Sequence, residues 1–501
     1  MNRGNNYPGS EVVYMSQANK PIILTIAAND SAGLAGVATD FKVQTAFGIH
    51  SMAAITANTA QNNFEVIAIN AVDVIALKEQ LEAVKSLPIA VVKVGLVCNI
   101  EQARAIASFV IATDIPLVLD PVLSSSSGFE FFKSKDIAAY VDLLLPLCAV
   151  VTPNLDEACL LTNLSVNTPE EIELAAESML LFGAKNILIK GGHAKGRICQ
   201  DYFASDADNF WLSSKKSLKK NTRGTGCAMA SAIASCLALG YPVNDAVVIA
   251  KMAINQGIRE GYSVGDSKGP VMINRFPDKQ IDLPILSKTS EVDLARECFP
   301  ECNETKLGLY PVVDSAEWLE HLLPAGVSTI QLRVKDLRGA ALENEIKQAI
   351  EVAREYDCRL FINDHWELAI QHGAYGVHLG QEDLDTADVD AILNAGIRLG
   401  ISTHCHFEVA RAIQYKPSYI ACGPVYHTNT KQMPWIPHGL DGLSYWRKVL
   451  AYPLVAIGGI NHDRIEGVAK TGVDSVAMIT AITEADDPEA ATKTFLEIVG
   501  S

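Results

Sequence analysis

Short runs of mostly apolar residues recur along the chain, and most are followed by a segment with helical periodicity. In the first half these runs lie at 22–28, 52–57, 91–96, 117–122, 149–153 and 186–191. A run that is apolar at nearly every position is typical of a strand buried on both faces, as in a parallel sheet. The alternation of such strands with helices predicts a layered α/β sheet, with sites at the carboxyl ends of the strands.

The second half repeats a shorter version of the same pattern eight times. Its apolar runs lie at 307–313, 329–334, 360–363, 376–379, 399–402, 419–425, 454–457 and 475–479. Eight strands that alternate with helices over about 200 residues predict a (β/α)₈ TIM barrel, with its chemistry at the carboxyl ends of the strands. The fold class expected for the whole chain is therefore α/β, a layered sheet domain followed by a TIM barrel.

Length and charge limit the classes of partner. A chain of 501 residues is too long for one core, and a formal net charge of −17 disfavours binding to nucleic acid or to an anionic membrane. The first residues lack the apolar core of a signal peptide, and no apolar run is long enough to span a bilayer. The 11 cysteines are scattered without CxxC pairs. We therefore expect reduced thiols, a cytoplasmic location, and no nucleic-acid or membrane partner.

The pattern also predicts the boundaries of the domains. Residues 1–20 read as a disordered arm, 21–277 as the first domain and 307–501 as the second. Between them, residues 278–306 mix prolines, charges and isolated apolar residues, which is typical of a linker. The pattern does not predict the oligomeric state, and a homo-oligomer is left open.

A glycine-rich turn at 221–227 opens an apolar helix predicted over 228–239. Glycines allow the backbone N–H groups to point outward, and the helix dipole adds partial positive charge, so the turn suits a phosphate. Cys227 then lies where its side chain reaches whatever covers the turn. An ordinary glycine-rich loop with a buried cysteine fits the same sequence.

Polar residues follow several of the predicted strands in the first half. Asp120 ends one strand, Asn154 and Glu157 follow the next, and Lys190 ends a third. A carboxylate one turn beyond an asparagine suits a Mg²⁺ that bridges phosphates, but the same spacing is that of a helix cap. The basic residues at 215–223 are read as a solvated hairpin or as a surface that steers ATP.

As an ordered set, these motifs resemble the ribokinase-like kinases, and within them the hydroxymethylpyrimidine and phosphomethylpyrimidine kinases of thiamine biosynthesis. The carriers are Asp30 with Gly33-Leu-Ala-Gly36, Asp40-Phe-Lys42, Thr59-Ala-Gln-Asn62, Asp120-Pro121, Thr152-Pro-Asn154 with Glu157, Lys190-Gly-Gly-His193 and Gly224-Thr-Gly-Cys227, over about residues 20–277. Most ribokinase relatives have Asp where this chain has Cys227, whereas the pyrimidine kinases have Cys. The resemblance implies ATP as phosphate donor, Mg²⁺, and hydroxymethylpyrimidine and its phosphate as substrates. It implies Cys227 as base; Ala28, Asp40 and Gln61 at the pyrimidine; Lys190, Gly224, Thr225 and Gly226 at the ATP phosphates; and Glu157 at the metal.

The polar residues of the second half also gather at predicted strand ends. Gln331, Arg333 and Lys335 alternate with period two, which points all three to one face of the second strand. Long polar side chains that face a barrel interior are costly unless they hold a ligand. Asp364 and Asp383 follow the third and fourth strands. Their joint occurrence at strand ends favours a functional site over separate caps and turns.

This half resembles thiamine-phosphate synthase over about residues 307–498. The signatures are Gln331-Leu-Arg-Val-Lys335, Phe361-Ile-Asn-Asp364, Gly376-Val-His-Leu-Gly-Gln-Glu-Asp383, Gly400-Ile-Ser402, Gly423-Pro-Val-Tyr-His-Thr-Asn-Thr-Lys431 and Ala456-Ile-Gly-Gly459. The resemblance implies that the pyrimidine diphosphate lies on Gln331, Arg333, Lys335, Asn363, Ser402 and Lys431. It further implies Mg²⁺ on Asp364 and Asp383, and thiazole phosphate on Thr428, Thr430, Gly459, Ile479 and Thr480.

Departures from the kinase pattern keep two alternatives open for the first half. Ala28 stands where the family has Gly, and a serine run at 124–127 replaces a phosphate-side lysine. The first half therefore reads either as the pyrimidine kinase, as a kinase for a pyridoxal-type vitamin, or as a non-catalytic pyrimidine-binding module.

Overall fold

The computed structural model describes residues 20–124, 130–192, 196–302, 306–428 and 436–500. These residues form two compact units, which divide between Val292 and Asp293. Residues 1–19 of the predicted arm lie outside the described residues. Within the described ranges, no helix has the length and apolarity needed to cross a membrane.

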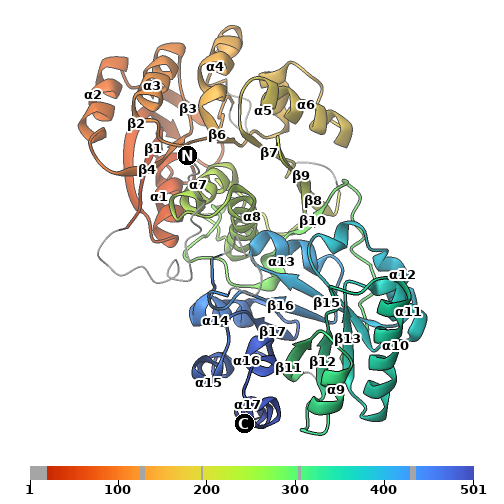
Figure 1. The fold of residues 1–501 in the computed structure, drawn as a ribbon. Coiled ribbons are helices and arrows are strands. Elements are labelled where there is room, and N and C mark those ends of the chain that lie inside the picture. The colour runs from red at the N-terminus through yellow and green to blue at the C-terminus, as the bar shows by residue number, and fades with distance from the viewer. Residues whose placement is uncertain (1–19, 125–129, 193–195, 303–305, 429–435, 501) are drawn as a thin grey trace. The chain divides into compact units, whose positions relative to one another are not determined.

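The first unit is built on a ten-stranded sheet with the order β10-β9-β8-β7-β6-β5-β4-β1-β2-β3 (Figure 1). The strands from β7 through β6, β5, β4 and β1 to β2 are parallel, and β3, β8, β9 and β10 join antiparallel. The predicted layered sheet is thus confirmed. The strands are β1 (Ile22–Asp30), β2 (His50–Gln61), β3 (Val66–Ala71), β4 (Ile89–Val94), β5 (Leu117–Leu119), β6 (Cys148–Val151), β7 (Asn186–Lys190), β8 (Ile198–Ser205), β9 (Asn209–Lys215) and β10 (Ile285–Ser287).

Helices cover both faces of this sheet because its central strands are apolar on both sides. Helices α2 to α6 pack on one face, and α1, α7 and α8 pack on the other (Figure 1). The helices are α1 (Gly36–Ala46), α2 (Val74–Val84), α3 (Ile100–Thr113), α4 (Ile137–Leu144), α5 (Leu155–Thr162), α6 (Pro169–Leu181), α7 (Thr225–Ala238) and α8 (Val243–Glu260), with short 3₁₀ turns η2 (Ser134–Asp136), η3 (Leu145–Leu147) and η4 (Gln280–Asp282).

The start of the predicted linker belongs to the first unit, which corrects the expected boundary. Within residues 278–306, the edge strand β10 pairs antiparallel with β9. Three residues are too few to show a strand period in the sequence, and the pairing with β9 is what makes them a strand. The first unit therefore continues past residue 277.

The second unit is a closed barrel of eight parallel strands in sequential order, as predicted (Figure 1). Its strands are β11 (Gly308–Val313), β12 (Thr329–Leu332), β13 (Arg359–Asn363), β14 (Gly376–Leu379), β15 (Arg398–Thr403), β16 (Tyr419–Cys422), β17 (Leu454–Ile457) and β18 (Ser475–Met478). Its helices are α9 (Glu317–Leu322), α10 (Gly339–Glu355), α11 (Trp366–His372), α12 (Val389–Asn394), α13 (His406–Ile413), α14 (Gly439–Val449), α15 (His462–Ala469), α16 (Thr480–Thr483) and α17 (Pro488–Gly500), with the 3₁₀ turn η5 (Asp383–Asp385).

Buried histidines make the stability of the barrel depend on pH. His406 is buried against Trp446 and shares a hydrogen bond of 3.0 Å between its Nε2 and the Tyr445 hydroxyl. Burial lowers the pKa of His406 to about 3, and burial lowers the pKa of His438 to about 4. Both rings are therefore neutral in the folded barrel at pH 7, whereas a histidine in the unfolded chain has a pKa of about 6.5.

We expect the barrel to lose stability as the pH falls from about 6.5 toward 4, because only the unfolded chain then takes up these protons. Each histidine adds a slope on the order of 1 kcal/mol per pH unit in that window. Denaturant unfolding of the barrel between pH 7.5 and 5 measures this dependence of the unfolding free energy on pH. His406→Gln removes one titrating group and should flatten the slope. An unchanged slope in that variant contradicts the assignment.

Candidate active sites in the two units

The glycine-rich turn of the first unit forms the first turn of α7. Gly224 has φ +78°, and a Cβ there would lie 2.4 Å from the Leu34 carbonyl oxygen, so glycine is required. Helix α7 begins at Thr225, earlier than the predicted 228, and this places Gly226 and Cys227 in the first turn. The first N–H groups of a helix have no carbonyl partner within the helix, so they can bind an anion.

Lys190 brings positive charge to the same turn. A Cβ added at Gly226 would lie 3.3 Å from Lys190 Nζ, which shows how closely the ammonium approaches the backbone. Lys190 ends β7, and its backbone pairs with that of Asn154 at the neighbouring strand end. The predicted phosphate residues Lys190, Gly224, Thr225 and Gly226 are therefore brought together.

The loop after β1 closes over the start of α7. The Asp30 carboxylate accepts hydrogen bonds from the N–H groups of Ala32, Leu34 and Ala35 at 2.8–2.9 Å. Ser31 Oγ exchanges hydrogen bonds with the backbone of Gln61, which ends β2. Ala28 is buried. Two of the residues predicted for the pyrimidine, Ala28 and Gln61, thus belong to neighbouring strands.

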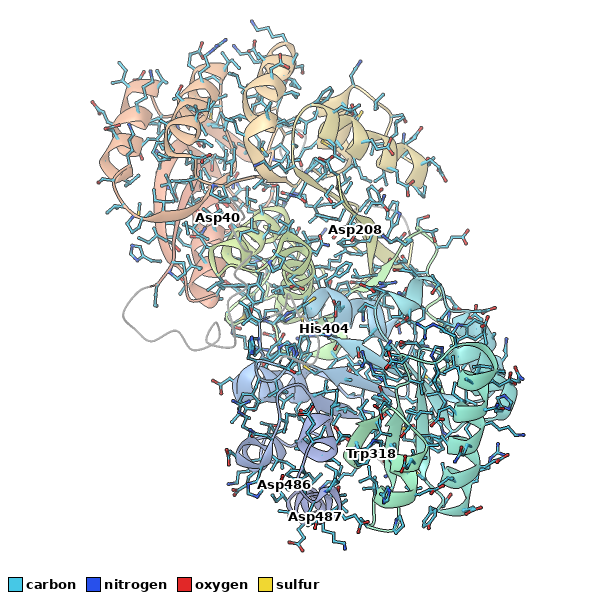
Figure 2. All side chains as sticks on the ribbon, viewed as in Figure 1. Asp40, Asp208, Trp318, His404, Asp486 and Asp487 are labelled. Carbon is cyan, nitrogen blue, oxygen red and sulfur yellow. The ribbon has the colours of Figure 1, made fainter. Side chains whose placement is uncertain are left out.

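A buried ion pair lies beneath this loop. Asp40 on α1 and Lys93 on β4 are both fully buried, with Lys93 Nζ 2.9–3.0 Å from the two carboxylate oxygens of Asp40. Ser231 on α7 donates to Asp40 at 2.7 Å, and Asp40 is labelled in Figure 2. Burial lowers the pKa of Lys93, but the charge of Asp40 outweighs this and raises it above its usual value. The predicted pyrimidine residue Asp40 is therefore already bonded to Lys93 and Ser231.

Cys227 is half-buried and belongs to a second group of polar side chains with Asp120 and Lys190. Its thiol lies beside the Asp120 carboxylate, whose Oδ1 lies 2.7 Å from Lys190 Nζ. Burial raises the pKa of the Cys227 thiol to about 12, which the nearby Lys93 opposes. Burial also raises the pKa of Asp120, but Lys190 outweighs it and the pKa of Asp120 is lowered. In the ligand-free site the sulfur is a thiol and Asp120 is a carboxylate.

Asn154 and Glu157 form a reciprocal cap at the start of α5. The Asn154 side chain accepts from the Glu157 N–H at 2.9 Å, and the Glu157 carboxylate accepts from the Asn154 N–H at 2.7 Å. Burial raises the pKa of Glu157 to about 7, which the charge of Lys190 opposes. The capping interpretation therefore describes these contacts, and the metal role of Glu157 stays a prediction.

The charged residues predicted for the site of the second unit lie at the mouth of the barrel. Strand β12 ends at Leu332. Of the three residues predicted to alternate along one strand, only Gln331 lies in it, and Arg333 and Lys335 follow it. Pairing with β11 and β13 stops at Leu332, which is why the strand is shorter than predicted. Lys335 Nζ lies 2.5 Å from the carboxylate of Asp364.

Asp364 and Asp383 converge at this mouth. Their carboxyl groups share a hydrogen bond, and the Gly380 N–H donates to Asp383 Oδ2 at 2.9 Å. Burial and the charge of Asp364 raise the pKa of Asp383. Burial raises the pKa of Asp364 as well, but Lys335 outweighs it and lowers that pKa. Two facing carboxyl groups fit a hard divalent ion that completes its shell with water and phosphate oxygens. Over the described ranges, no cluster of three or more His, Cys, Asp or Glu residues suits a metal.

The remaining predicted residues of the barrel lie at strand ends or outside the described residues. Asn363 is buried at the end of β13, and Ser402 is half-buried in β15. A Cβ added at Gly459 would lie 2.5 Å from the His427 carbonyl oxygen, so the loop after β17 packs tightly on the loop after β16. Ile479 caps α16, which begins at Thr480. Thr428 is the last described residue before a gap, and Thr430 and Lys431 lie outside the described residues.

Sequence reasoning missed two buried residues with specific partners, Lys93 and His378. Lys93 interrupts an otherwise apolar strand, and that break in the pattern was the available signal. His378 lies in β14, with its ring between the Tyr419 hydroxyl and Ser402 Oγ. Burial lowers the pKa of His378 to about 4, so the ring is neutral.

Comparison with known proteins assigns a family to each unit. The family phosphomethylpyrimidine kinase matches residues 30–272, and thiamine monophosphate synthase matches residues 309–482. The thiamine-phosphate synthase of Serratia proteamaculans (strain 568) is 58% identical over 195 residues, which cover 39% of this chain and 92% of that protein.

Solved structures resemble the first unit. Pyridoxal kinase from Staphylococcus aureus in complex with ADP matches with a TM-score of 0.50 and 26% identity, over 54% of this chain and 98% of that chain. Phosphomethylpyrimidine kinase from Clostridium difficile 630 matches with 34% identity and a TM-score of 0.43, over 48% of this chain and 100% of that chain. The chain thus belongs to the thiamine-phosphate synthase family and also carries a phosphomethylpyrimidine kinase domain, which makes it a bifunctional transferase of thiamine biosynthesis.

Proposed function

We propose that the two units catalyse consecutive steps in one chain. The first transfers phosphate from ATP to hydroxymethylpyrimidine and then to its monophosphate. The second joins the resulting diphosphate to thiazole phosphate and releases thiamine phosphate and pyrophosphate. The observation that carries the proposal is the presence of both family domains in one chain, because the product of the first is the substrate of the second.

The two families imply small-molecule substrates, ATP as the phosphate donor of the kinase, and a divalent metal, and we propose Mg²⁺ as that metal. In the kinase unit, Glu157 would hold it, and in the barrel Asp364 and Asp383 would. When bound, the ion neutralises phosphate charge that the acidic chain would otherwise repel.

In the kinase unit, the first turn of α7 and Lys190 hold the transferring phosphate, and Cys227 takes the proton of the attacking alcohol. A thiol with a pKa of about 12 does not ionise before the reaction. The Asp120 carboxylate lies beside that thiol, so the S–H proton passes to Asp120 as sulfur receives the alcohol proton. The alcohol oxygen then bonds to phosphorus and ADP leaves.

In the barrel, Arg333, Lys335 and Lys431 hold the diphosphate. Their charge stabilises the departing pyrophosphate, which lets the electron-rich pyrimidine methylene separate as a cation. The ring nitrogen of thiazole phosphate, held near Gly459 and Thr480, captures that cation. The family chemistry supplies this dissociative path, and the cations at the end of β12 suit it.

A substrate panel with the full chain tests the kinase assignment. We expect ADP formation with hydroxymethylpyrimidine and with its monophosphate, and a much lower kcat/KM with pyridoxal. Preference for pyridoxal favours the vitamin-kinase alternative, to which the likeness to pyridoxal kinase gives weight. No ADP with any substrate favours a binding module.

A further inference from the structure

A continuous series of hydrogen bonds crosses the interior of the barrel beneath the proposed diphosphate site. Gln331 on β12 lies beside the hydroxyl of Tyr310 on β11. The Tyr310 hydroxyl lies 2.9 Å from that of Tyr419 on β16, which in turn lies 2.7 Å from His378 Nδ1. His378 Nε2 lies 2.8 Å from Ser402 Oγ on β15. The series therefore begins beside Gln331 and ends at Ser402, and both residues are proposed for the pyrimidine diphosphate.

The barrel is shaped to admit this series. A Cβ added at Gly400 would lie 2.1 Å from the Tyr419 ring, so only glycine leaves room for that ring across β15. The rings of Tyr419 and His378 are stacked, with centroids 5.7 Å apart and an angle of 21° between the planes. Tyr310 and Phe361 pack edge-on or tilted against Tyr419 and each other. This packing fixes the position of both ring nitrogens of His378.

The series decides the orientation of the Ser402 hydroxyl. A serine hydroxyl rotates freely about its C–O bond unless a partner holds it. His378 Nε2 is that partner, and Tyr419 holds His378 from the opposite side through Nδ1. An oriented hydroxyl loses less freedom when it binds a phosphate oxygen than a rotating one does.

We propose that His378 is a positioning residue of the synthase, which acts on the pyrimidine diphosphate through the hydroxyl of Ser402. The inference rests on the proposed function, because it needs Ser402 at the diphosphate. His378 itself does not touch the substrate in this account.

A double-mutant cycle on the full chain, supplied directly with pyrimidine diphosphate and thiazole phosphate, tests the proposal. His378→Asn keeps a group near Nδ1 but loses the contact to Ser402, whereas His378→Gln keeps an amide nitrogen near Nε2. We expect His378→Asn to lower kcat/KM for the diphosphate about 10-fold, the effect of one lost hydrogen bond, and His378→Gln to restore most of it. The KM for thiazole phosphate should not change.

The decisive arm is the Ser402→Ala background. If His378 acts through Ser402, His378→Asn causes no further loss there, because the two variants remove one shared interaction. Losses that multiply instead, or a fall in kinase activity of the same protein, show a general structural role and overturn the inference. If the wild-type chain makes no thiamine phosphate from the diphosphate, the proposed function fails first. If the wild type is active and the cycle is additive, only the inference fails.

Discussion

Cys227→Ala lowers the rate of pyrimidine phosphorylation by about 10²–10⁴-fold, the usual contribution of a general base. The reason is the position of the thiol, which lies in the first turn of α7 beside Asp120. The measurement is ADP formation with hydroxymethylpyrimidine. The coupling reaction of the same protein, supplied with the diphosphate, should keep its wild-type rate.

A matched control separates catalysis from packing. Cys236 lies on the same helix and is fully buried, but it is not part of the Asp120 group. Cys236→Ala removes a more deeply buried thiol from the same helix and should leave the kinase rate close to wild type. Wild-type kinase activity in Cys227→Ala would make Cys227 a structural residue. Equal losses in both variants would mean that the helix, and not the base, had been damaged.

Asp383→Asn lowers thiamine-phosphate formation roughly 10³-fold, because a metal ion supplies several kcal/mol of charge stabilisation to a departing phosphate group. The kinase reaction of the same chain should be unchanged. The affinity for the diphosphate should also lose its dependence on Mg²⁺, which binding measurements across a Mg²⁺ titration detect without turnover.

The same substitution has a second consequence in the absence of metal. Burial and the charge of Asp364 raise the pKa of Asp383, so ionising both carboxyl groups costs stability as the pH rises through that pKa. Asp383→Asn should therefore leave the metal-free barrel at least as stable as the wild type at pH 8. Asp385→Asn is the control, since Asp385 lies in the same turn and pairs with Arg411. An unchanged Mg²⁺ dependence in Asp383→Asn would remove Asp383 from the metal site.

The sequence predicted what depends on local pattern. Buried strands such as β1 and β17 are apolar over most of their length, and the ends of such strands carried the polar residues that meet in the fold. Glycine at 224 was recognisable because a turn that approaches another backbone has no room for a side chain.

What the sequence did not predict depends on pairing between distant residues. Strand β10 forms because it pairs with β9, and β12 ends where its pairing with β11 and β13 stops. Lys93 pairs with the carboxylate of Asp40, which lies 53 residues earlier in the chain and on another element. His378 bonds to partners 24 and 41 residues later. A single lysine or histidine in an apolar strand signals a buried polar contact, but not which residue makes it.

The coupled reaction tests the central claim most directly. The full chain is incubated with hydroxymethylpyrimidine, ATP, Mg²⁺ and thiazole phosphate, and every pyrimidine product is resolved over time. The account predicts the monophosphate first, then the diphosphate, and finally thiamine phosphate and pyrophosphate, with two ADP formed for each thiamine phosphate. An absence of thiamine phosphate from this mixture, while the same protein makes it from added diphosphate, would contradict a chain that performs both steps.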